Sequence, residues 1–511
     1  MTRITMEVLL AVYVLLALFN VDFCAKIVVL PAAGTSHVSQ GSNIGNALAK
    51  NGHDVFMILP DKYRQMDKYK GGALKILTHH TPEKDTEEYD LGKMMKQMIG
   101  ISPSAAFGMG IPGLEENCRN VLSDQKLYNK LKDMKVDLFV VDSFVLTQCV
   151  YVLPYRLGVP YASYGTAQIP EWARSPALPS FVPMKFGTPY TEKMTFLERI
   201  DNTYSALLWS WFPKPDSNEH NWVKQFAPEM PPITVHQLLL RSSLWLINND
   251  IVIDYPRPFM PNEIYCGGLT TKPAKALPEN LEKIANEAEH GVIIMSFGSG
   301  SPDLQSEKFM RVFAKLKQVV LWRHMSEYNG DVPVPKNVHL LKWLPQNDLL
   351  GHNNTKLFIT HGGSNGQFEG LYHGVPMLAF PIFAEQPFNA KRLVYHGFGK
   401  VLNIMTFNEG ELELAIREII SDPSYSRKIK HASKIYRSRP ETPADRVTMW
   451  VNHVLEYGDR HLKSHALEMP WYSYCMLDIF AFLIVATFVI SMLTYKLFRR
   501  CCCRKSKRKI E

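Results

Sequence analysis

The sequence contains little cysteine, and its cysteines lack the spacings that bind metals or carry redox chemistry. Of the 8 cysteines, Cys118, Cys149 and Cys266 are the ones that lie well inside the chain, away from its apolar ends. An odd number of such cysteines argues against a disulfide framework. From the sequence we therefore expect neither a metal centre nor a disulfide-stabilised fold.

Two further absences exclude whole classes of function. The first predicted strand is followed by PAAGTSHVSQG, which has no Gly-x-Gly-x-x-Gly run, so a dinucleotide oxidoreductase is excluded. The net charge of +8 arises almost entirely from the basic tail at residues 496–511, which contributes +7. The rest of the chain is nearly neutral and gives no reason to expect nucleic acid as a partner.

The composition is that of a large globular protein with an apolar segment at each end. With 511 residues and 46% hydrophobic content, the chain is long enough for two or more domains. Residues 1–25 contain Arg3 and a 12-residue apolar run from Val8 to Phe19, which predicts a cleavable secretory signal. An N-terminal membrane anchor is the alternative, but this run is too short for it.

The second apolar segment, residues 474–495, is long enough to span a bilayer core of roughly 30 Å. Trp471 and Tyr472 stand before it, where interfacial aromatic residues belong, and basic residues follow it. This order predicts one span, lumenal domains and a cytosolic tail. Lys507 and Lys509 have the spacing of a dilysine retrieval signal, so we expect residence in the endoplasmic reticulum membrane; a plain stop-transfer charge cluster is the alternative.

The first half of the chain begins as an open, parallel α/β domain. A strand at Lys26–Pro31, a helix from about Gly41 to Asn51 and a strand at Asp54–Leu59 form one strand, helix, strand unit. His37 falls in the loop after the first strand, and loops at this position face the ligand cleft. Asp142 ends another predicted strand. Taken alone, His37 would be a surface histidine and Asp142 a turn residue.

The most informative run extends from Trp343 to Gln386. It predicts a strand at Leu357–Thr360, a sharp turn at residues 361–363 and a helix at Ser364–His373. The glycines of the turn allow close backbone approach, and the free N–H groups of the helix start attract an anion. This part of the run predicts a phosphate-binding site.

Flanking residues of the same run suit the other parts of a nucleotide sugar. Trp343 offers a flat ring for a base, and Gln346 offers a donor and an acceptor for its edge. The carboxylate of Glu369 can accept from ribose hydroxyls. Glu385 and Gln386 follow the next predicted strand and suit sugar hydroxyls.

With these residues in these places, the run resembles the signature of the UDP-glycosyltransferase family, the membrane-bound enzymes of animal detoxification that include the UDP-glucuronosyltransferases. The resemblance covers nearly the whole chain and is strongest in its second half. The matching positions are Trp343, Gln346, Thr360, His361, Gly362, Gly363, Gly366, Glu369, Pro376, Pro381, Glu385 and Gln386. Many animal members have Asp-Gln where this chain has Glu385-Gln386. The carboxylate is therefore kept, but on a longer side chain.

The resemblance implies an α/β fold of two doubly wound, Rossmann-like domains that face a cleft, the GT-B type, followed by one C-terminal transmembrane helix. We expect the following divisions of the chain: a signal peptide (1–25), an acceptor-binding domain (26–282), a UDP-sugar-binding domain (283–442), a helix returning to the first domain with a juxtamembrane segment (443–473), a transmembrane helix (474–495) and a cytosolic tail (496–511).

The resemblance also implies an inverting hexosyltransferase that acts on a hydroxyl of a small lipophilic acceptor. His37 would be the base, and Asp142 would orient and stabilise its imidazole. The diphosphate would lie on His361 and on the backbone N–H groups of the turn and helix start. The residues expected to bind UDP are Ser299, Trp343, Gln346, His361, Gly362, Gly363, Ser364, Asn365, Gly366 and Glu369.

The donor sugar stays open between two hexoses. Arg257 stands where some glucuronosyl-transferring members have an arginine, which favours glucuronate; packing in the linker or a surface ion pair is its alternative role. UDP-glucose is the runner-up. The chain contains no Asp-x-Asp pair, the metal clamp of the other main glycosyltransferase fold, so we expect no metal and no cofactor beyond the UDP-sugar. A noncatalytic UDP-sugar-binding membrane protein is the alternative from another class.

Overall fold

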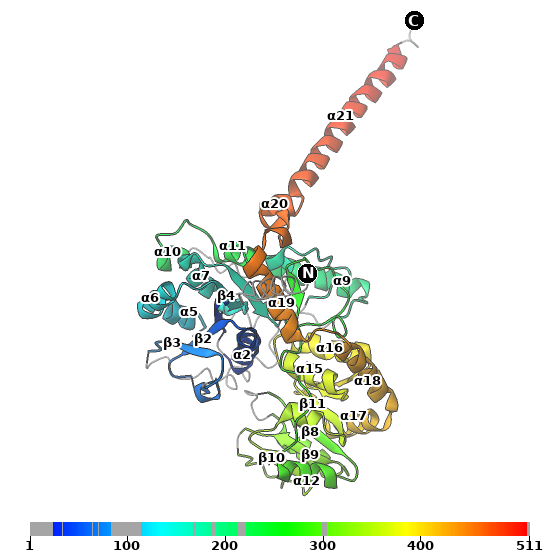
Figure 1. Ribbon diagram of the computed structural model, residues 1–511. Coiled ribbons are helices and arrows are strands. Elements are labelled where there is room, and N and C mark those ends of the chain that lie inside the picture. The colour runs from blue at the N-terminus through cyan, green and yellow to red at the C-terminus, as the bar shows by residue number, and fades with distance from the viewer. Residues whose placement is uncertain are drawn as a thin grey trace, which may run out of the picture. The chain divides into compact units, whose positions relative to one another are not determined.

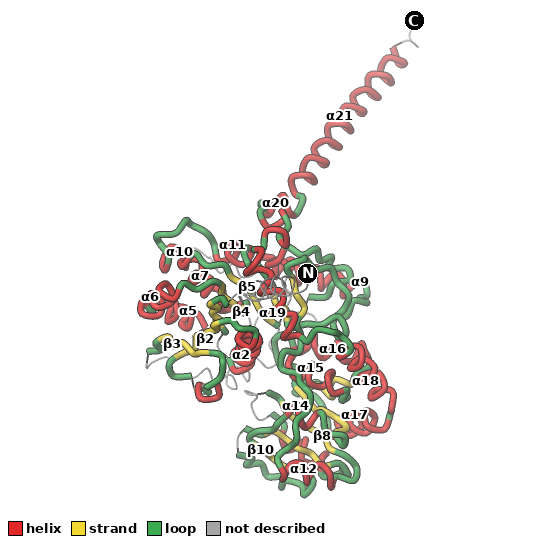
Figure 2. Tube along the Cα trace, viewed as in Figure 1, coloured by secondary structure: helices red, strands yellow, loops and turns green. Residues whose placement is uncertain are grey.

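The computed structural model describes residues 24–32, 34–63, 65–69, 71–82, 114–166, 170–184, 190–211, 221–298, 304–325 and 327–507 (Figure 1). The signal segment and Ser299 lie outside these ranges. Residues 24–462 contain two parallel sheets, each accompanied by helices (Figure 2).

The first sheet has seven parallel strands in the order β3-β2-β1-β4-β5-β6-β7. Its strands are β1 (Lys26–Leu30), β2 (Asp54–Pro60), β3 (Lys75–His79), β4 (Leu138–Asp142), β5 (Tyr161–Gly165), β6 (Trp245–Ile247) and β7 (Glu263–Tyr265). The central strands β4 and β5 are buried along their whole length. Continuous burial of this kind is typical of a parallel sheet with both faces covered.

The second sheet has six parallel strands in the order β10-β9-β8-β11-β12-β13. Its strands are β8 (Val292–Ser296), β9 (Val319–Arg323), β10 (Val338–Leu341), β11 (Thr355–Thr360), β12 (Met377–Ala379) and β13 (Gly399–Val401). The strand order reverses between β8 and β11. In open sheets of this type, ligands bind at the carboxyl ends of the strands beside such a reversal.

Helices cover both sheets. Those associated with the first sheet are α2 (Thr35–Lys50), α5 (Leu114–Ser123), α6 (Gln125–Met134), α7 (Val152–Leu157), α8 (Pro170–Ala173), α9 (Phe196–Trp211), α10 (Trp222–Phe226) and α11 (Val235–Leu240). Those that follow in sequence are α12 (Glu279–Glu287), α13 (Ser306–Phe313), α14 (Gln346–Leu350), α15 (Ser364–His373), α16 (Gln386–His396), α17 (Glu409–Ser421) and α18 (Pro423–Arg437).

Helix α19 (Pro443–Tyr457) packs against α2, although some 400 residues separate them in the chain (Figure 1). Its start is well defined, because Thr442 and Asp445 form a capping box and Pro443 occupies the first turn. Val447 and Val451 are fully buried in the same apolar cluster as Val29 and Val38 of the first domain. Helix α19, which follows the second sheet in the chain, thereby packs onto the first domain.

Residues 463–511 form a separate unit that contains α20 (Trp471–Tyr474) and α21 (Leu477–Lys507). The stretch Leu477–Arg500 has a mean hydropathy of 2.3 and no buried residues. Among the described residues it is the one helix long and apolar enough to cross a membrane. It begins three residues after the predicted start at Tyr474.

The structure differs from the sequence-based expectations at the start of α2. This helix begins at Thr35, not near Gly41, so His37 lies in its first turn and not in a preceding loop. Gly34, with a φ of 123°, makes the turn out of β1. Burial of Val38 against the sheet offsets the weak helix propensity of this polar run.

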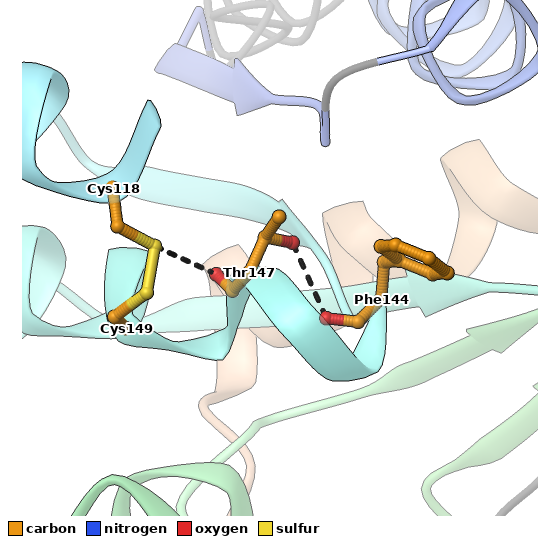
Figure 3. The surroundings of a disulfide bond; sticks show 4 residues. All are labelled: Cys118, Phe144, Thr147 and Cys149. Carbon is orange, nitrogen blue, oxygen red and sulfur yellow. Dashed lines mark hydrogen bonds between the residues drawn. A yellow bond between two sulfur atoms is a disulfide. The ribbon is translucent and has the colours of Figure 1, made fainter. Parts of the chain in front are cut away.

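A second correction concerns the cysteines. Cys118 in α5 and Cys149 in the 3₁₀ segment η3 (Val145–Tyr151) form a disulfide, although the odd number of cysteines argued against a disulfide framework (Figure 3). The Cys118 sulfur lies 3.6 Å from the Thr147 carbonyl oxygen, and the Thr147 hydroxyl donates to the Phe144 carbonyl. Counting cysteines was misleading because Cys266 is buried and left unpaired. The disulfide braces the segment that follows Asp142.

Replacing Gly41 with valine is expected to destabilise the protein by about 2 kcal/mol. A β-carbon at this position would lie 2.6 Å from the Tyr164 hydroxyl and 3.2 Å from Val29 Cγ1, and both side chains are fully buried. Thermal unfolding measures the effect. Gly72→Val is the control, because its β-carbon would meet no atom of the described residues nearer than 3.9 Å. Equal melting temperatures for Gly41→Val and wild type would contradict this packing.

Candidate active site

The clearest chemical group at the edge of the first sheet is a histidine and aspartate pair. His37 Nδ1 lies 2.8 Å from Asp142 Oδ2, joining the first turn of α2 to the end of β4. A carboxylate can only accept, so Nδ1 is the protonated nitrogen and Nε2 is left with a lone pair. The His37 side chain is 19% exposed and that of Asp142 is 1% exposed. The imidazole is thus reachable from solvent, whereas its partner is not.

Asp142 is held on both sides. Its other oxygen, Oδ1, accepts from the Phe144 backbone N–H at 2.9 Å. The Phe144 ring lies with its centroid 4.9 Å from that of His37. One carboxylate thereby fixes the tautomer of the imidazole, and the aromatic ring limits its tilt.

The charges around His37 set the direction in which its pKa is shifted. Burial lowers the pKa of His37, but the charge and hydrogen bond of Asp142, with a contribution from Glu385, raise it above 6.5 overall. Glu385 belongs to the other half of the chain, next to α16. The predicted sugar-binding acid therefore acts electrostatically on the predicted base.

The turn after β11 is built around the His361 ring. A β-carbon at Gly363 would lie 2.5 Å from His361 Nε2, and one at Gly298 would lie 3.1 Å from the same atom. Gly298 and Gly362 also have φ values of 84° and 83°, which favour glycine. The sequence therefore needs glycine at these positions to seat the imidazole beside the start of α15.

The electrostatic setting of His361 is opposite to that of His37. Burial and the positive charge of Arg323 lower the pKa of His361 to about 4, with a small opposing effect of the Ser296 carbonyl. His361 is therefore neutral at physiological pH and can donate a hydrogen bond without carrying charge.

The start of α15 has the features of an anion site. No side chain caps it, since Gly363 is the N-cap residue, so the first N–H groups lack intrahelical acceptors. Asn389 of α16 holds the turn by donating to the Gly362 carbonyl at 3.0 Å and to Ser364 Oγ at 3.2 Å. Asn365 accepts from Asn248 at 3.1 Å. Asn389 was not predicted, because nothing in its local sequence marks it.

The residues predicted for base and ribose also come together. Gln346 Nε2 donates to Glu369 Oε2 at 2.6 Å, and Trp343 is 65% exposed. Burial raises the pKa of Glu369 to about 7, although Gln346 and Lys272 oppose the shift. Lys272 belongs to the segment between the domains. Asn347 holds this segment in place, because its side chain accepts from the Lys272 backbone N–H and donates to the Lys272 carbonyl.

The three residues predicted to contact sugar have different surroundings. Glu385 precedes α16, and Gln386 uses its side-chain oxygen to accept from the Ile382 and Phe383 backbone N–H groups. Arg257 forms an ion pair with Asp254 at 3.3 Å, and both side chains are buried, so this is not the surface ion pair given above as one of its alternative roles. Contacts of these residues with a sugar stay predictions, as does the role of Ser299.

The family model described as UDP-glucoronosyl and UDP-glucosyl transferase matches residues 25–510. This chain belongs to that family. UDP-glycosyltransferases of this kind are UDP-dependent enzymes, so the predicted family and enzyme class are confirmed.

Individual relatives give the same result. UDP-glucuronosyltransferase 2A3 of Cavia porcellus is 33% identical, and the match covers 94% of this chain and 93% of that protein. The human protein of the same name is also 33% identical, over 98% of both chains. A relative from Mus musculus, 2-hydroxyacylsphingosine 1-beta-galactosyltransferase, is 32% identical over 92% of this chain and 88% of its own length.

Solved structures of glycosyltransferases share the fold. The calicheamicin glycosyltransferase CalG4 is 17% identical with a TM-score of 0.60, and it covers 85% of this chain and 99% of its own. Phytolacca americana UGT2, solved with UDP-2fluoro-glucose and pterostilbene, is 16% identical with a TM-score of 0.59 over the same shares. The predicted fold of two parallel α/β domains is thus confirmed.

Proposed function

We propose that this UDP-glycosyltransferase is an inverting enzyme that moves a glucuronosyl group from UDP-glucuronate to a hydroxyl of a small lipophilic acceptor. The observation that carries the proposal is the hydrogen bond between His37 Nδ1 and the buried Asp142, which leaves Nε2 available as a base. No cofactor other than the UDP-sugar enters this proposal.

In the reaction, His37 Nε2 takes the proton from the acceptor hydroxyl as its oxygen attacks the anomeric carbon. The bond from that carbon to the diphosphate oxygen breaks, and UDP leaves with the electron pair. Asp142 stabilises the imidazolium that forms. Attack opposite to the leaving group inverts the anomeric centre. The raised pKa of His37 supports this role, because a stronger base accepts the proton more readily.

The departing diphosphate gains negative charge and needs donors that are already in place. The N–H groups at the start of α15, with the positive end of its dipole, supply them without a metal ion. Neutral His361 adds one further donor. Trp343 would stack on uracil, and Glu369 would accept from the ribose hydroxyls.

Glucuronate is the first candidate for the sugar because relatives named as UDP-glucuronosyltransferases match this chain over 94% and 98% of its length. Arg257 and Arg392 lie beside Phe388, two residues after Gln386, but both are buried and form ion pairs with Asp254, so they add no support. UDP-glucose is the second candidate, and a relative named as a galactosyltransferase makes UDP-galactose worth testing.

We further propose that the enzyme is a type I protein of the endoplasmic reticulum membrane, with its catalytic domains in the lumen. The support is the apolar helix at Leu477–Arg500, followed by a basic segment. A lumenal location is compatible with the disulfide between Cys118 and Cys149, since disulfides persist in oxidising compartments.

Membranes that contain the protein are expected to release UDP from UDP-glucuronate in the presence of phenol or steroid acceptors. His37→Ala should lower the rate by about two to four orders of magnitude, because the acceptor loses its base. The exposed His290→Ala is the matched control. UDP-glucose and UDP-galactose are measured in parallel. If only UDP-glucose or only UDP-galactose supports turnover, that sugar takes the place of glucuronate in the proposal. UDP-sugar binding without any turnover would favour a noncatalytic role.

Donor affinity should increase with pH around neutrality. Glu369, with a pKa of about 7, must be ionised to accept from both ribose hydroxyls, so UDP-sugar affinity is expected to be lower at pH 6 than at pH 8. Calorimetry at the two pH values tests this, because the diphosphate of a UDP-sugar does not titrate there. Glu369→Gln should bind weakly at both pH values, whereas the exposed Glu289→Gln should behave as wild type. An unchanged pH dependence in Glu369→Gln would exclude Glu369 as the cause.

A further inference from the structure

Arg392, in the second half of α16, is an arginine whose side chain is only 1% exposed. Its Nη1 donates to Asn249 at 2.9 Å and to Asp254 at 3.3 Å. Its Nη2 donates to Asn389 at 2.7 Å and to Gln367 at 3.2 Å. Buried ion pairs add little to stability, because the cost of removing the charges from water offsets their attraction. The four fixed acceptors therefore indicate a role for Arg392 other than stabilising the core.

Arg392 determines which way the Asn389 side chain is turned. A guanidinium can only donate, so the amide oxygen of Asn389 must face Arg392. The amide nitrogen then faces the opposite side, where it donates to the Gly362 carbonyl at 3.0 Å and to Ser364 Oγ at 3.2 Å. With the amide reversed, its oxygen would face the Gly362 carbonyl oxygen and its nitrogen would face the guanidinium. Both contacts would then be repulsive, so Arg392 selects the orientation that holds the carbonyl.

The carbonyl held by Asn389 belongs to the peptide that joins Gly362 to Gly363. A trans peptide is planar, and its C=O and N–H point in opposite directions. While Asn389 holds the carbonyl, the Gly363 N–H points away from Asn389, and it has no partner among the described residues. Gly362 has a φ of 83°, and glycine adopts several backbone conformations at low cost. The contact with Asn389 therefore fixes a direction that the glycines alone would leave open.

The acceptors that anchor Arg392 come from the segment that follows β6 of the first sheet. Asn249 and Asp254 lie in this segment, and both are buried. Asn248, directly after β6, donates to Asn365 in the first turn of α15 at 3.1 Å. The contacts around the turn thus extend from the end of a strand in the first sheet to the start of α15.

We propose that Arg392 is a positioning residue for glycosyl transfer, which acts through Asn389 to keep the Gly363 N–H directed at the anionic ligand. This inference rests on the proposed function, since it takes the diphosphate of the UDP-sugar as the ligand of this turn. Arg392 is buried and acts on the peptide, not on the ligand. If the peptide between Gly362 and Gly363 turned over, a carbonyl oxygen would face the diphosphate, and a donor in place for the leaving group would be lost.

The test compares equilibrium binding of UDP and of uridine, which lacks the diphosphate, to the detergent-solubilised full-length protein. Arg392→Met should weaken UDP by about tenfold or more and leave uridine unaffected, because one donor to the anion is lost. Arg392→Lys can still donate to Asn389 and should keep part of the affinity. Equal weakening of UDP and uridine would overturn the inference, because it would indicate a general structural role.

The matched control is Arg439→Gln. Arg439 forms an ion pair with Asp250 of the same segment, and none of its described contacts reaches the turn. Removing it leaves the buried carboxylate of Asp250 unpaired, so the melting temperature should fall. Its affinities for UDP and uridine should equal those of wild type. The control thereby separates loss of stability from loss of the peptide orientation.

A double-mutant cycle tests whether Arg392 acts through Asn389. Asn389→Ala should weaken UDP about as much as Arg392→Met does, and the double variant should lose little more, because both changes remove the same contact. Fully additive losses would overturn the inference, as would unchanged UDP binding in Arg392→Met. If Arg392→Met does not fold, unchanged UDP binding in Asn389→Ala overturns the inference.

The outcomes separate this inference from the proposed function, because equilibrium binding needs neither turnover nor His37. Unchanged UDP binding in the variants, with wild-type turnover that depends on His37, would overturn the inference alone. UDP binding that depends on Arg392 in a protein without turnover would overturn the proposed function and support the inference. A wild-type protein that binds no UDP would overturn both.

Discussion

The proposed reaction depends on one hydrogen bond, from His37 Nδ1 to Asp142. It can form because β1 and β4 are neighbours in the first sheet, with Leu30 opposite Val141, so the segments after both strands leave from the same edge. Parallel pairing therefore brings together two residues that are 105 positions apart. The early start of α2 completes the arrangement, since it places His37 on a rigid helical turn.

Two histidines, His37 after β1 and His361 after β11, have opposite electrostatic surroundings. His37 is next to a buried carboxylate, which keeps its pKa above the ordinary value, whereas His361 is buried near the positive charge of Arg323 and has a pKa of about 4. The first environment suits a base and the second a neutral hydrogen-bond donor. In the proposed function, environment and not residue type divides proton acceptance and diphosphate binding between them.

Local signals in the sequence were sufficient for some parts of this site but not for others. The bounds of α15, Ser364–His373, are those predicted, because glycines stand at both of its ends and nothing distant is needed to define it. The disulfide between Cys118 and Cys149 was missed, since it depends on the packing of α5 against η3. Asn389 was missed for the same reason: it acts on Gly362 across 27 positions, and an asparagine inside a helix gives no sign of that contact.

The most direct test of the central claim is the pH dependence of kcat/KM for wild type and Asp142→Asn. His37 must be neutral to accept a proton, so activity should fall as the pH drops through a value above 6.5, the ordinary pKa of histidine. Asp142→Asn removes the charge that raises this pKa. We expect its acid limb to move to lower pH and its maximal rate to fall by about two orders of magnitude or more. An acid limb at the same pH in both proteins would contradict the account.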